Sequence, residues 1–230
     1  VGFGILPTVQ NELILHGIPR VSCILYSNAC MLAGGLAICR QKGLRAALPA
    51  GKALRLGVIG LMGMGLTPLL LTGAFAYIPV GTATVIHFLY PTVVTVGSAV
   101  LFRNRMGPAA LAAIALSIAG MACISLPGGA GGGSGTGYLL ALASSFTYAF
   151  YIMGPALLGT GELPLPVSLV SMAGGNVVIF FTAALCTGGL VLPDSLGMWL
   201  LVLCYCGMMA GCYALLSCGI RLIGPVDASF

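Results

Sequence analysis

Several polar side chains that could bind a solute lie inside long apolar runs of the sequence, and His87 is the most informative of them. It follows Val80, where one such run begins, by seven residues, which is ~10 Å along an α-helix. An ionisable group at that depth in a membrane is by default a candidate for contact with a substrate or a proton. The alternative is that His87 hydrogen-bonds between two helices and only fixes their packing.

Small and polar residues recur at helical spacing along the same run. They form one stripe, made of Gly81, Thr84, His87 or Phe88, Pro91, Thr95 and Ser98. Such a stripe is expected to face a cavity or a neighbouring helix. Thr84 is therefore a second candidate for contact with a substrate.

Hydroxyl groups are concentrated in the segment 140–154, where Ser144, Tyr148 and Tyr151 share one helical face. A wall of tyrosines suits an amphipathic metabolite, so these three residues are also candidates. Tyrosine is equally common where helices leave a membrane. The pattern alone leaves both interpretations open.

One carboxylate and three amides complete the candidate binding residues. Gln10 and Glu12 lie toward the end of the first apolar segment, where Glu12 could bind a cationic amine or relay a proton. The alternative is that Glu12 belongs to a solvated helix end. Asn28 and Asn176 occupy similar depths in the two halves of the chain, and such amides could bind a zwitterion or hydrogen-bond between helices.

Other kinds of chemistry have little support in the sequence. The chain contains no GxxxxGK[ST] loop for a nucleotide, and its cysteines are not spaced as a metal site. The string Gly132-Gly133-Ser134-Gly135-Thr136 lacks the strand and helix that would activate a serine. We therefore predict no catalytic residue, no metal and no cofactor, and we do not expect an enzyme.

The composition indicates a membrane protein. Of the 230 residues, 59% are hydrophobic and 6% are charged. In soluble domains roughly a quarter of all residues are charged. The net charge of +5 comes from basic residues between apolar runs. It is not the basic face that binding to a nucleic acid requires.

Those apolar runs must position the candidate residues, and each is long enough to cross a bilayer as a helix of about 20 residues. Seven full spans are predicted, at residues 22–39, 54–73, 80–102, 108–126, 137–158, 166–188 and 197–218. Residues 1–15 resemble the rest of a span whose start is missing, and 226–230 the first turn of another. We expect a polytopic all-α protein that is seen here as about eight of ten spans.

Basic residues predict how the spans are oriented. If every span crosses once, eight Lys and Arg residues fall on one side and only Arg20 on the other. The positive-inside rule makes the basic side cytoplasmic. We expect a multi-pass protein of the plasma (inner) membrane.

Particular glycines and prolines predict local features of the spans. Gly57, Gly60 and Gly63, and in a later span Gly207 and Gly211, are expected where helices approach closely. Pro68 and Pro91 interrupt their spans, where each is either a flex point for gating or an ordinary tolerated kink.

An internal repeat divides the chain into two halves. At an offset of 146 residues the matches include Gly65 with Gly211, Gly73 with Gly219, and Pro79-Val80 with Pro225-Val226. The glycine-rich segment 128–136 is expected to link a first repeat, 1–127, to a second, 137–230, that lacks its last two helices. Halves of about five spans must enter the membrane from opposite sides, as in the inverted repeats of many transporters.

Three segments of the sequence resemble a known family. They are GAFAYIPVGTATVIHFLYPTVVTVGSAVLFRNRM (73–106), LALASSFTYAFYIMG (140–154) and GIRLIGPVDASF (219–230), and together they are similar to the EamA-type branch of the drug/metabolite transporter superfamily. The resemblance implies two inverted five-helix repeats, cytoplasmic termini, and export of amino acids, related metabolites or drugs. Asn104 stands where this family commonly has Glu.

The sequence therefore predicts a secondary transporter for small molecules that works by alternating access within the lipid bilayer. Its cavity is expected between the spans at 1–15, 22–39, 80–102, 137–158 and 166–188, which hold most of the polar residues inside the membrane. Coupling to a proton and assembly as a homodimer stay open at this point. The alternative function is a flippase for a lipid or lipid-linked headgroup.

Overall fold

The computed structural model describes residues 2–102, 112, 114–116, 119–120 and 134–229. Within these residues the chain forms helices joined by short connections, and no β-strand occurs. The helices are α1 (Gly2–Leu15), α2 (Arg20–Gln41), α3 (Ala50–Gly60), the π-helical turn η1 (Leu61–Leu66), α4 (Thr67–Ala74), α5 (Val80–His87), α6 (Tyr90–Phe102), α8 (Gly135–Leu157), α9 (Leu165–Thr187), α10 (Leu196–Ile223) and the 3₁₀ turn η2 (Asp227–Ser229).

Six of the predicted spans are confirmed as helices long and apolar enough to cross a membrane. The predicted span at 108–126 lies mostly outside the described residues, as do Asn104 and most of the segment 128–136. Large apolar side chains cover the outside of the helices, for example Leu54, Leu139 and Leu222. Such a surface is stable against lipid rather than water, so the chain is a polytopic all-α membrane protein.

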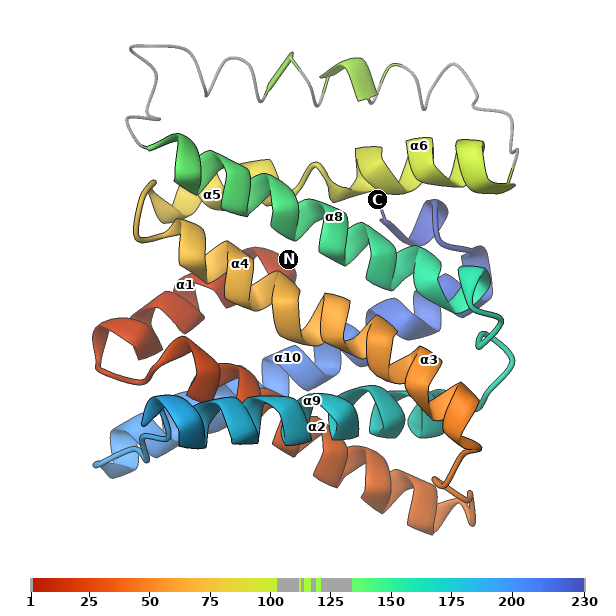
Figure 1. Ribbon diagram of the computed structural model, residues 1–230, viewed down its shortest axis with the longest axis horizontal. Helices are drawn as coiled ribbons and strands as arrows, with labels where there is room; N and C mark the ends of the chain where they lie inside the picture. Colours follow the sequence, from red (N-terminus) through yellow and green to blue (C-terminus); the bar gives the residue numbers. More distant parts are fainter. Residues whose placement is uncertain (1, 103–111, 113, 117–118, 121–133, 230) are drawn as a thin grey trace.

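The connections between helices lie alternately at the two ends of the bundle (Figure 1). One end, which we call the basic end, carries the α2–α3 and α8–α9 connections and the last turn of α10. Six of the basic residues lie there: Arg40, Lys42, Arg45, Lys52, Arg55 and Arg221. Arg20 lies at the opposite end, while Arg103 and Arg105 are outside the described residues. The charge bias predicted from the sequence thus separates the two ends.

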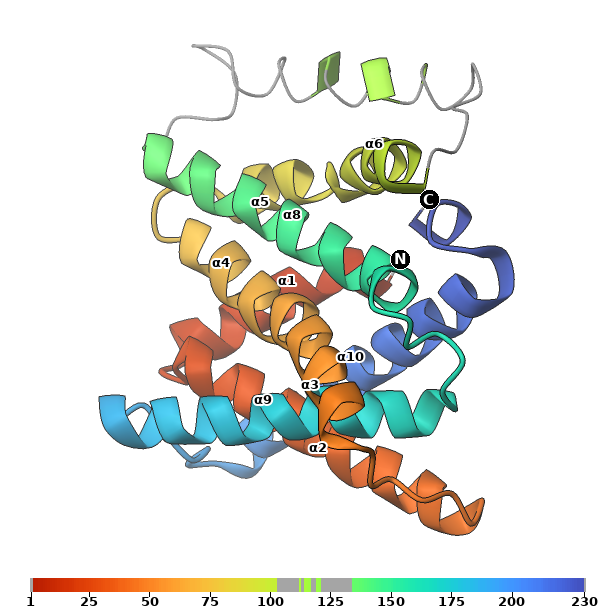
Figure 2. The same cartoon turned by 45° about the vertical axis from the view of Figure 1, so that its right-hand side comes forward.

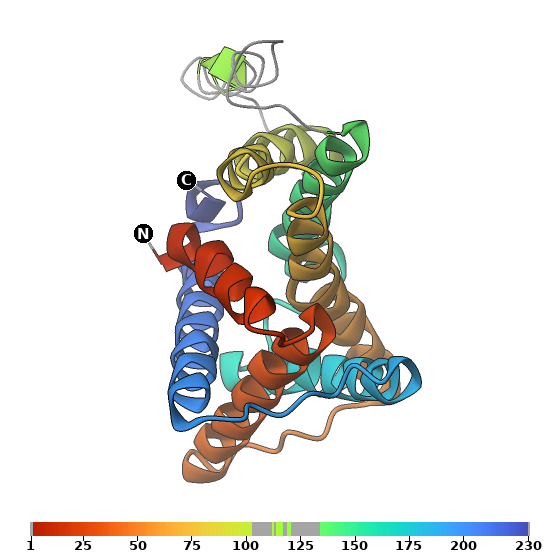
Figure 3. The same ribbon diagram turned by 90° about the vertical axis from the view of Figure 1, so that its left-hand side faces the viewer.

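Figure 3, turned by 90° from Figure 1, views the bundle along its helices. α5 and α6 lie at the top, α8 and the α3–α4 span on one side, α2 and α9 at the bottom, and α1 and α10 on the other side. Neighbours in this arrangement pack directly, including α4 with α8, α2 with α9 and α1 with α10. Side chains that point inward from these helices therefore meet near the centre.

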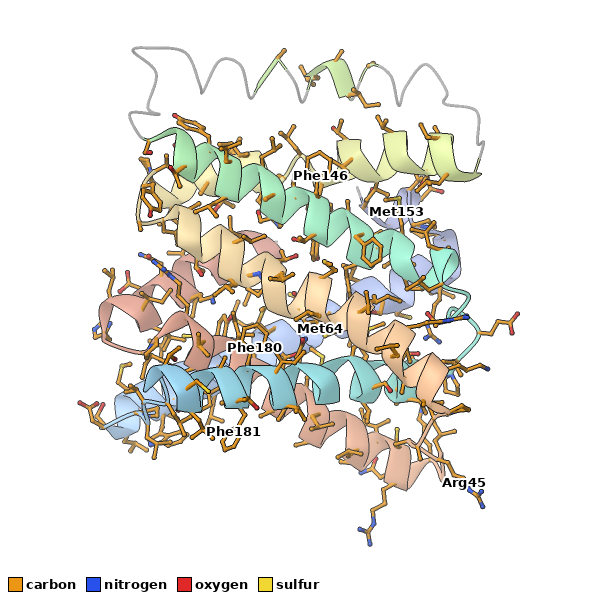
Figure 4. The ribbon with its side chains drawn as sticks, in the orientation of Figure 1. Arg45, Met64, Phe146, Met153, Phe180 and Phe181 are labelled. Atoms are coloured by element: carbon orange, nitrogen blue, oxygen red, sulfur yellow. The ribbon has the colours of Figure 1, made fainter. Side chains whose placement is uncertain are left out.

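Two adjacent phenylalanines of α9 show which face of this helix points into the bundle. Phe180 points toward the α3–α4 span and is buried, whereas its neighbour Phe181 points outward and is 45% exposed (Figure 4). At the basic end the side chain of Arg45 extends away from the helices. The bundle thus directs aromatic side chains to both its core and its lipid-facing surface.

The predicted interruption at Pro68 is a π-helical turn. The Thr67 N–H donates to the carbonyl of Met62, five residues earlier, and Pro68 has no N–H to donate. The carbonyls of Gly63 and Met64 therefore lose their ordinary helical donors. The Tyr213 hydroxyl of α10 donates to Gly63 O at 2.8 Å, and Asn28 Nδ2 of α2 donates to Met64 O at 3.2 Å.

Asn28 and Asn176 meet beside this turn. Asn176 Nδ2 donates to Asn28 Oδ1 at 3.1 Å and to Gly60 O at 3.0 Å. Both side chains are buried. Their hydrogen bonds connect α2, α9 and the α3–α4 span, since amides inside a membrane are stabilised by partners on other helices.

Two of the predicted close approaches occur where the α3–α4 span crosses its neighbours (Figure 2). A Cβ atom on Gly60 would lie 2.8 Å from Met172 Cα of α9, and one on Gly63 would lie 2.3 Å from Tyr151 Cγ of α8. The same expectation was wrong for Gly207 and Gly211. Both face the outside of α10, and apart from the adjoining backbone of that helix no atom of the described residues lies within 4 Å of a Cβ built on either of them.

The predicted interruption at Pro91 divides its span into α5 and α6. α5 ends at His87, the Phe88 N–H still donates to Thr84 O at 3.0 Å, and α6 begins at Tyr90. Pro91 cannot donate to the His87 carbonyl four residues earlier. The break splits the predicted polar stripe at His87, so His87 and Phe88 lie at a helix end.

Gly60→Ala should destabilise the bundle, because the new methyl group would meet the backbone of α9 rather than a movable side chain. We expect a loss of about 1–3 kcal/mol, as for overpacked cores, measured as a lower unfolding temperature of the purified protein in detergent. The control is Gly57→Ala, one turn earlier in α3, where a Cβ meets no atom within 4 Å. Equal unfolding temperatures for the two variants would contradict the close crossing.

Candidate functional site

A pocket lies where α1, α4, α8 and α10 face the break between α5 and α6. It holds about 480 Å³ of unfilled space, its open mouth included. We call it the polar pocket; its lining comprises Gln10, Thr67, His87, Phe88, Tyr90, Tyr148 and Tyr213, together with the apolar Leu6, Pro7, Pro68, Leu71 and Met209. Its size and mixed lining are typical of a site for a small organic molecule.

Both helix interruptions help to form this pocket. The π-helical turn precedes Thr67 and Pro68, and α4 then presents Leu71 one turn further on. At the other interruption, α5 ends at His87, so the chain places Phe88 and Tyr90 at the pocket before α6 continues. Irregular backbone at membrane depth is stable where protein surrounds it or where it lines a cavity. Both conditions are met here.

A hydrogen bond to α8 orients the imidazole ring of His87. His87 Nδ1 lies 2.9 Å from Ser144 Oγ, and Ser144 Oγ donates to Ala141 O at 2.6 Å. Because the serine hydroxyl has one proton, we assign the Nδ1 proton to the bond with Ser144. The neutral ring then carries its lone pair on Nε2, which is available to accept a hydrogen bond from a bound molecule.

Aromatic rings pack around His87. The ring centroids of Tyr148 and Tyr90 lie 5.3 and 5.6 Å from that of His87, and Tyr90 and Tyr148 meet edge to face at 4.7 Å. Tyr213 completes this wall from α10. The faces of such rings attract cations and also pack against apolar groups.

Gln10 brings an amide from α1 to the polar pocket. Its side chain is buried, and within the described part of the chain Nε2 has no hydrogen-bond partner. A buried donor without a partner is costly, and this cost is removed if a bound molecule or water accepts from it. The pocket thus offers one donor, at Gln10, and one acceptor, at His87.

Tyr148, Tyr151 and Tyr213 form a layer at the inner end of the polar pocket. Tyr148 and Tyr151 stack with centroids 5.9 Å apart, and Tyr151 meets Tyr213 edge to face at 5.4 Å. Tyr148 and Tyr213 line the polar pocket, whereas Tyr151 lines a second pocket that extends toward Arg221 at the basic end. All three rings are almost fully buried. This tyrosine layer separates the two pockets.

The remaining predicted residues lie elsewhere. Thr84 donates to Val80 O at 2.7 Å within its own helix, and Glu12 is exposed near the end of α1. Asn28 and Asn176 bond to each other and to the turn before Pro68. None of these four lines either pocket described here.

The set of helices around the pocket also differs from the sequence prediction. The polar pocket is lined, as predicted, by α1, the α5–α6 span and α8. Its other two walls come from α4 and α10, whereas the sequence had predicted α2 and α9. The amides of α2 and α9, on which that prediction rested, are used in bonds between helices. Among the polar and flexible lining residues, sequence reasoning missed Thr67, Tyr90, Met209 and Tyr213. The offset of 146 residues pairs Thr67 with Tyr213, but it points to neither of them without one already being known.

Comparisons with known proteins agree with this architecture. A solved crystal structure, described only as that of a protein, aligns with 99% of this chain and 84% of its own chain, with a TM-score of 0.68 and 20% sequence identity. A likeness at this identity shows the fold. No curated protein matches the chain. The family model of the EamA-like transporter family matches residues 2–126, which is more than half of the chain, and the chain therefore belongs to this family of membrane transporters.

Proposed function

We propose that this chain is a secondary transporter that binds a small amphipathic molecule in the polar pocket and moves it by alternating access. The cargo is an amino acid, a related small metabolite or a drug, exported across the plasma (inner) membrane from the cytoplasmic, basic end. The observation that carries this proposal is the pairing of a free donor on Gln10 with an oriented acceptor on His87 inside an aromatic wall.

The chemistry of the polar pocket favours a cargo that carries both a donor and an acceptor. An amine or hydroxyl donates to His87 Nε2, while a carbonyl or carboxylate oxygen accepts from Gln10 Nε2. The faces of Tyr90 and Tyr148 then stabilise an ammonium group or an apolar side chain. His87, whose imidazole ring lines this pocket, is the residue through which a proton gradient would act.

The tyrosine layer supports alternating access. Tyr148 and Tyr213 face one pocket and Tyr151 faces the other, so a molecule in either pocket is separated from the other by packed rings. Passage requires these rings to part. The interruptions at Pro68 and Pro91 allow the adjoining helices to change their angle, since each lacks a helical hydrogen bond.

His87→Phe should slow transport, because it keeps a ring but removes both nitrogens. We expect at least ~10-fold slower counterflow of amino acids and amines into liposomes, the cost of one buried hydrogen bond to a charged group. The control is His16→Phe at the chain's other histidine, which is exposed outside the polar pocket.

Counterflow by His87→Phe at the wild-type rate would contradict the proposed binding site. A wild-type protein that exchanges none of these solutes above empty vesicles would contradict the transport proposal. In the same vesicles, fluorescent phospholipids test the alternative cargo: their translocation without solute exchange would favour a lipid flippase.

Ser144→Ala should act through His87, because the ring loses the partner that orients it and fixes the proton on Nδ1. We expect the apparent KM for the cargo to rise roughly 3- to 10-fold, as for a lost hydrogen bond of about 1 kcal/mol. Ser145→Ala is the matched control, since Ser145 is equally buried and bonds only to Leu142 O of its own helix. Equal KM values for the two variants would rule out this positioning role.

A further inference from the structure

The second pocket lies at the basic end, between α8, α9 and α10, on the far side of the tyrosine layer. We call it the basic-end pocket, and its unfilled space is about 380 Å³ with its mouth included. One wall is apolar, from Leu56, Leu169 and Met172. Tyr151, Ser217 and Arg221 add polar groups to the lining. This arrangement combines an apolar surface with a fixed positive charge.

Neutral oxygen atoms hold the guanidinium of Arg221 at this pocket. Nη1 donates to Leu163 O, and Nη2 donates to Ser168 Oγ at 3.0 Å. No carboxylate of the described residues forms an ion pair with it. A guanidinium has five N–H donors in a planar fork, so three remain for a ligand after these two bonds. Its charge is oriented without being neutralised.

Hydroxyl groups around the pocket supply further donors. Thr160 is 2% exposed, and its Oγ1 has no hydrogen-bond partner among the described residues. Tyr151 Oη and Ser217 Oγ are 2.9 Å apart. Their mutual bond uses one of two hydroxyl protons, which leaves the other to donate to a ligand. A buried hydroxyl without a partner is rare in a folded core, and this one lines the same pocket as the Arg221 guanidinium.

Within the predicted repeat, this charge belongs to one half of the chain. At the offset of 146 residues Arg221 aligns with Phe75, and Ser217 aligns with Leu71. Leu71 lines the polar pocket and Ser217 lines the basic-end pocket, so this one pair of positions lines the two pockets with different chemistry. At both aligned positions the residue is apolar in the first half and polar in the second.

We propose that the basic-end pocket binds the anionic group, a carboxylate or a phosphate, of a small amphipathic molecule. Arg221 supplies the opposite charge in a bidentate fork, Thr160 and the Tyr151–Ser217 pair supply hydroxyl donors, and Leu56, Leu169 and Met172 contact the apolar part. The proposal that this pocket binds an anion is supported by the geometry alone. The proposal that cargo enters through it from the basic end rests on the proposed transport function.

The test measures equilibrium binding to the purified full chain in nanodiscs of neutral phosphatidylcholine. The probes are 3-phenylpropionate, its uncharged isostere 3-phenylpropanamide, and dihexanoyl phosphatidic acid as a lipid phosphate. We expect at least one anion to bind about 10-fold or more tightly than the amide, as charge-assisted hydrogen bonds predict. Binding of the carboxylate identifies a soluble metabolite as the source of the anion, and preferential binding of the phosphate identifies a lipid headgroup.

Arg221→Gln should remove the preference for the anion, and Arg221→Lys should keep part of it. Arg55→Gln is the matched control, because Arg55 also donates to a carbonyl of the α8–α9 connection, Leu158 O at 3.1 Å, but does not line the pocket. His16→Phe, at a histidine that lines neither pocket, should bind the anion normally. Because equilibrium binding is measured without transport, loss of this site and failure of the transport proposal are distinguishable. Wild-type protein that binds all three probes alike, or Arg221→Gln that keeps the preference, would overturn the proposal.

Discussion

Pro68 has no N–H, and this missing donor inside a membrane-spanning helix is the constraint on which the rest of the structure depends. Lipid offers no replacement for the hydrogen bond, so protein must supply it. Asn28 from α2 and Tyr213 from α10 donate to the carbonyls of Met64 and Gly63, and Asn176 from α9 donates to Gly60 O. One interrupted turn thereby fixes the positions of three other helices.

The same turn connects packing to binding. Gly60 and Gly63 bring the α3–α4 span against α9 and α8, and the crossing at Gly63 sets Tyr151 in place. Tyr151 packs on Tyr148 and Tyr213, and this layer divides the polar pocket from the basic-end pocket. The Tyr213 hydroxyl that satisfies Gly63 O thus belongs to a ring that also lines the polar pocket. A movement that opens the layer must therefore disturb the bonds around Pro68.

Hydrophobic length and loop charge predicted the fold well, because a bilayer demands about 20 apolar residues for each span and basic loops orient them. Proline also predicted the interruptions before Pro68 and Pro91. Contacts between residues on different helices were harder to infer from the sequence. Nothing in the sequence around Asn28 or Asn176 indicates that these amides bond to each other and to a distant helix rather than to a cargo. Gly207 and Gly211 likewise have the same spacing as packed glycines, yet face outward, because spacing defines a helix face without saying what lies against it.

The interrupted turn at Pro68 builds the polar pocket at the cost of regular helical hydrogen bonds. Pro68→Ala restores an N–H that can close a regular α-helical turn and compete with Asn28 for the Met64 carbonyl. The decisive measurement compares counterflow and unfolding temperature of this variant with those of Pro7→Ala, which also removes a proline that lines the pocket inside a helix. We predict that Pro68→Ala unfolds at an equal or higher temperature but transports ~10-fold more slowly, as trade-offs between stability and activity require, while Pro7→Ala transports nearly normally. Transport by Pro68→Ala at the wild-type rate would contradict the account.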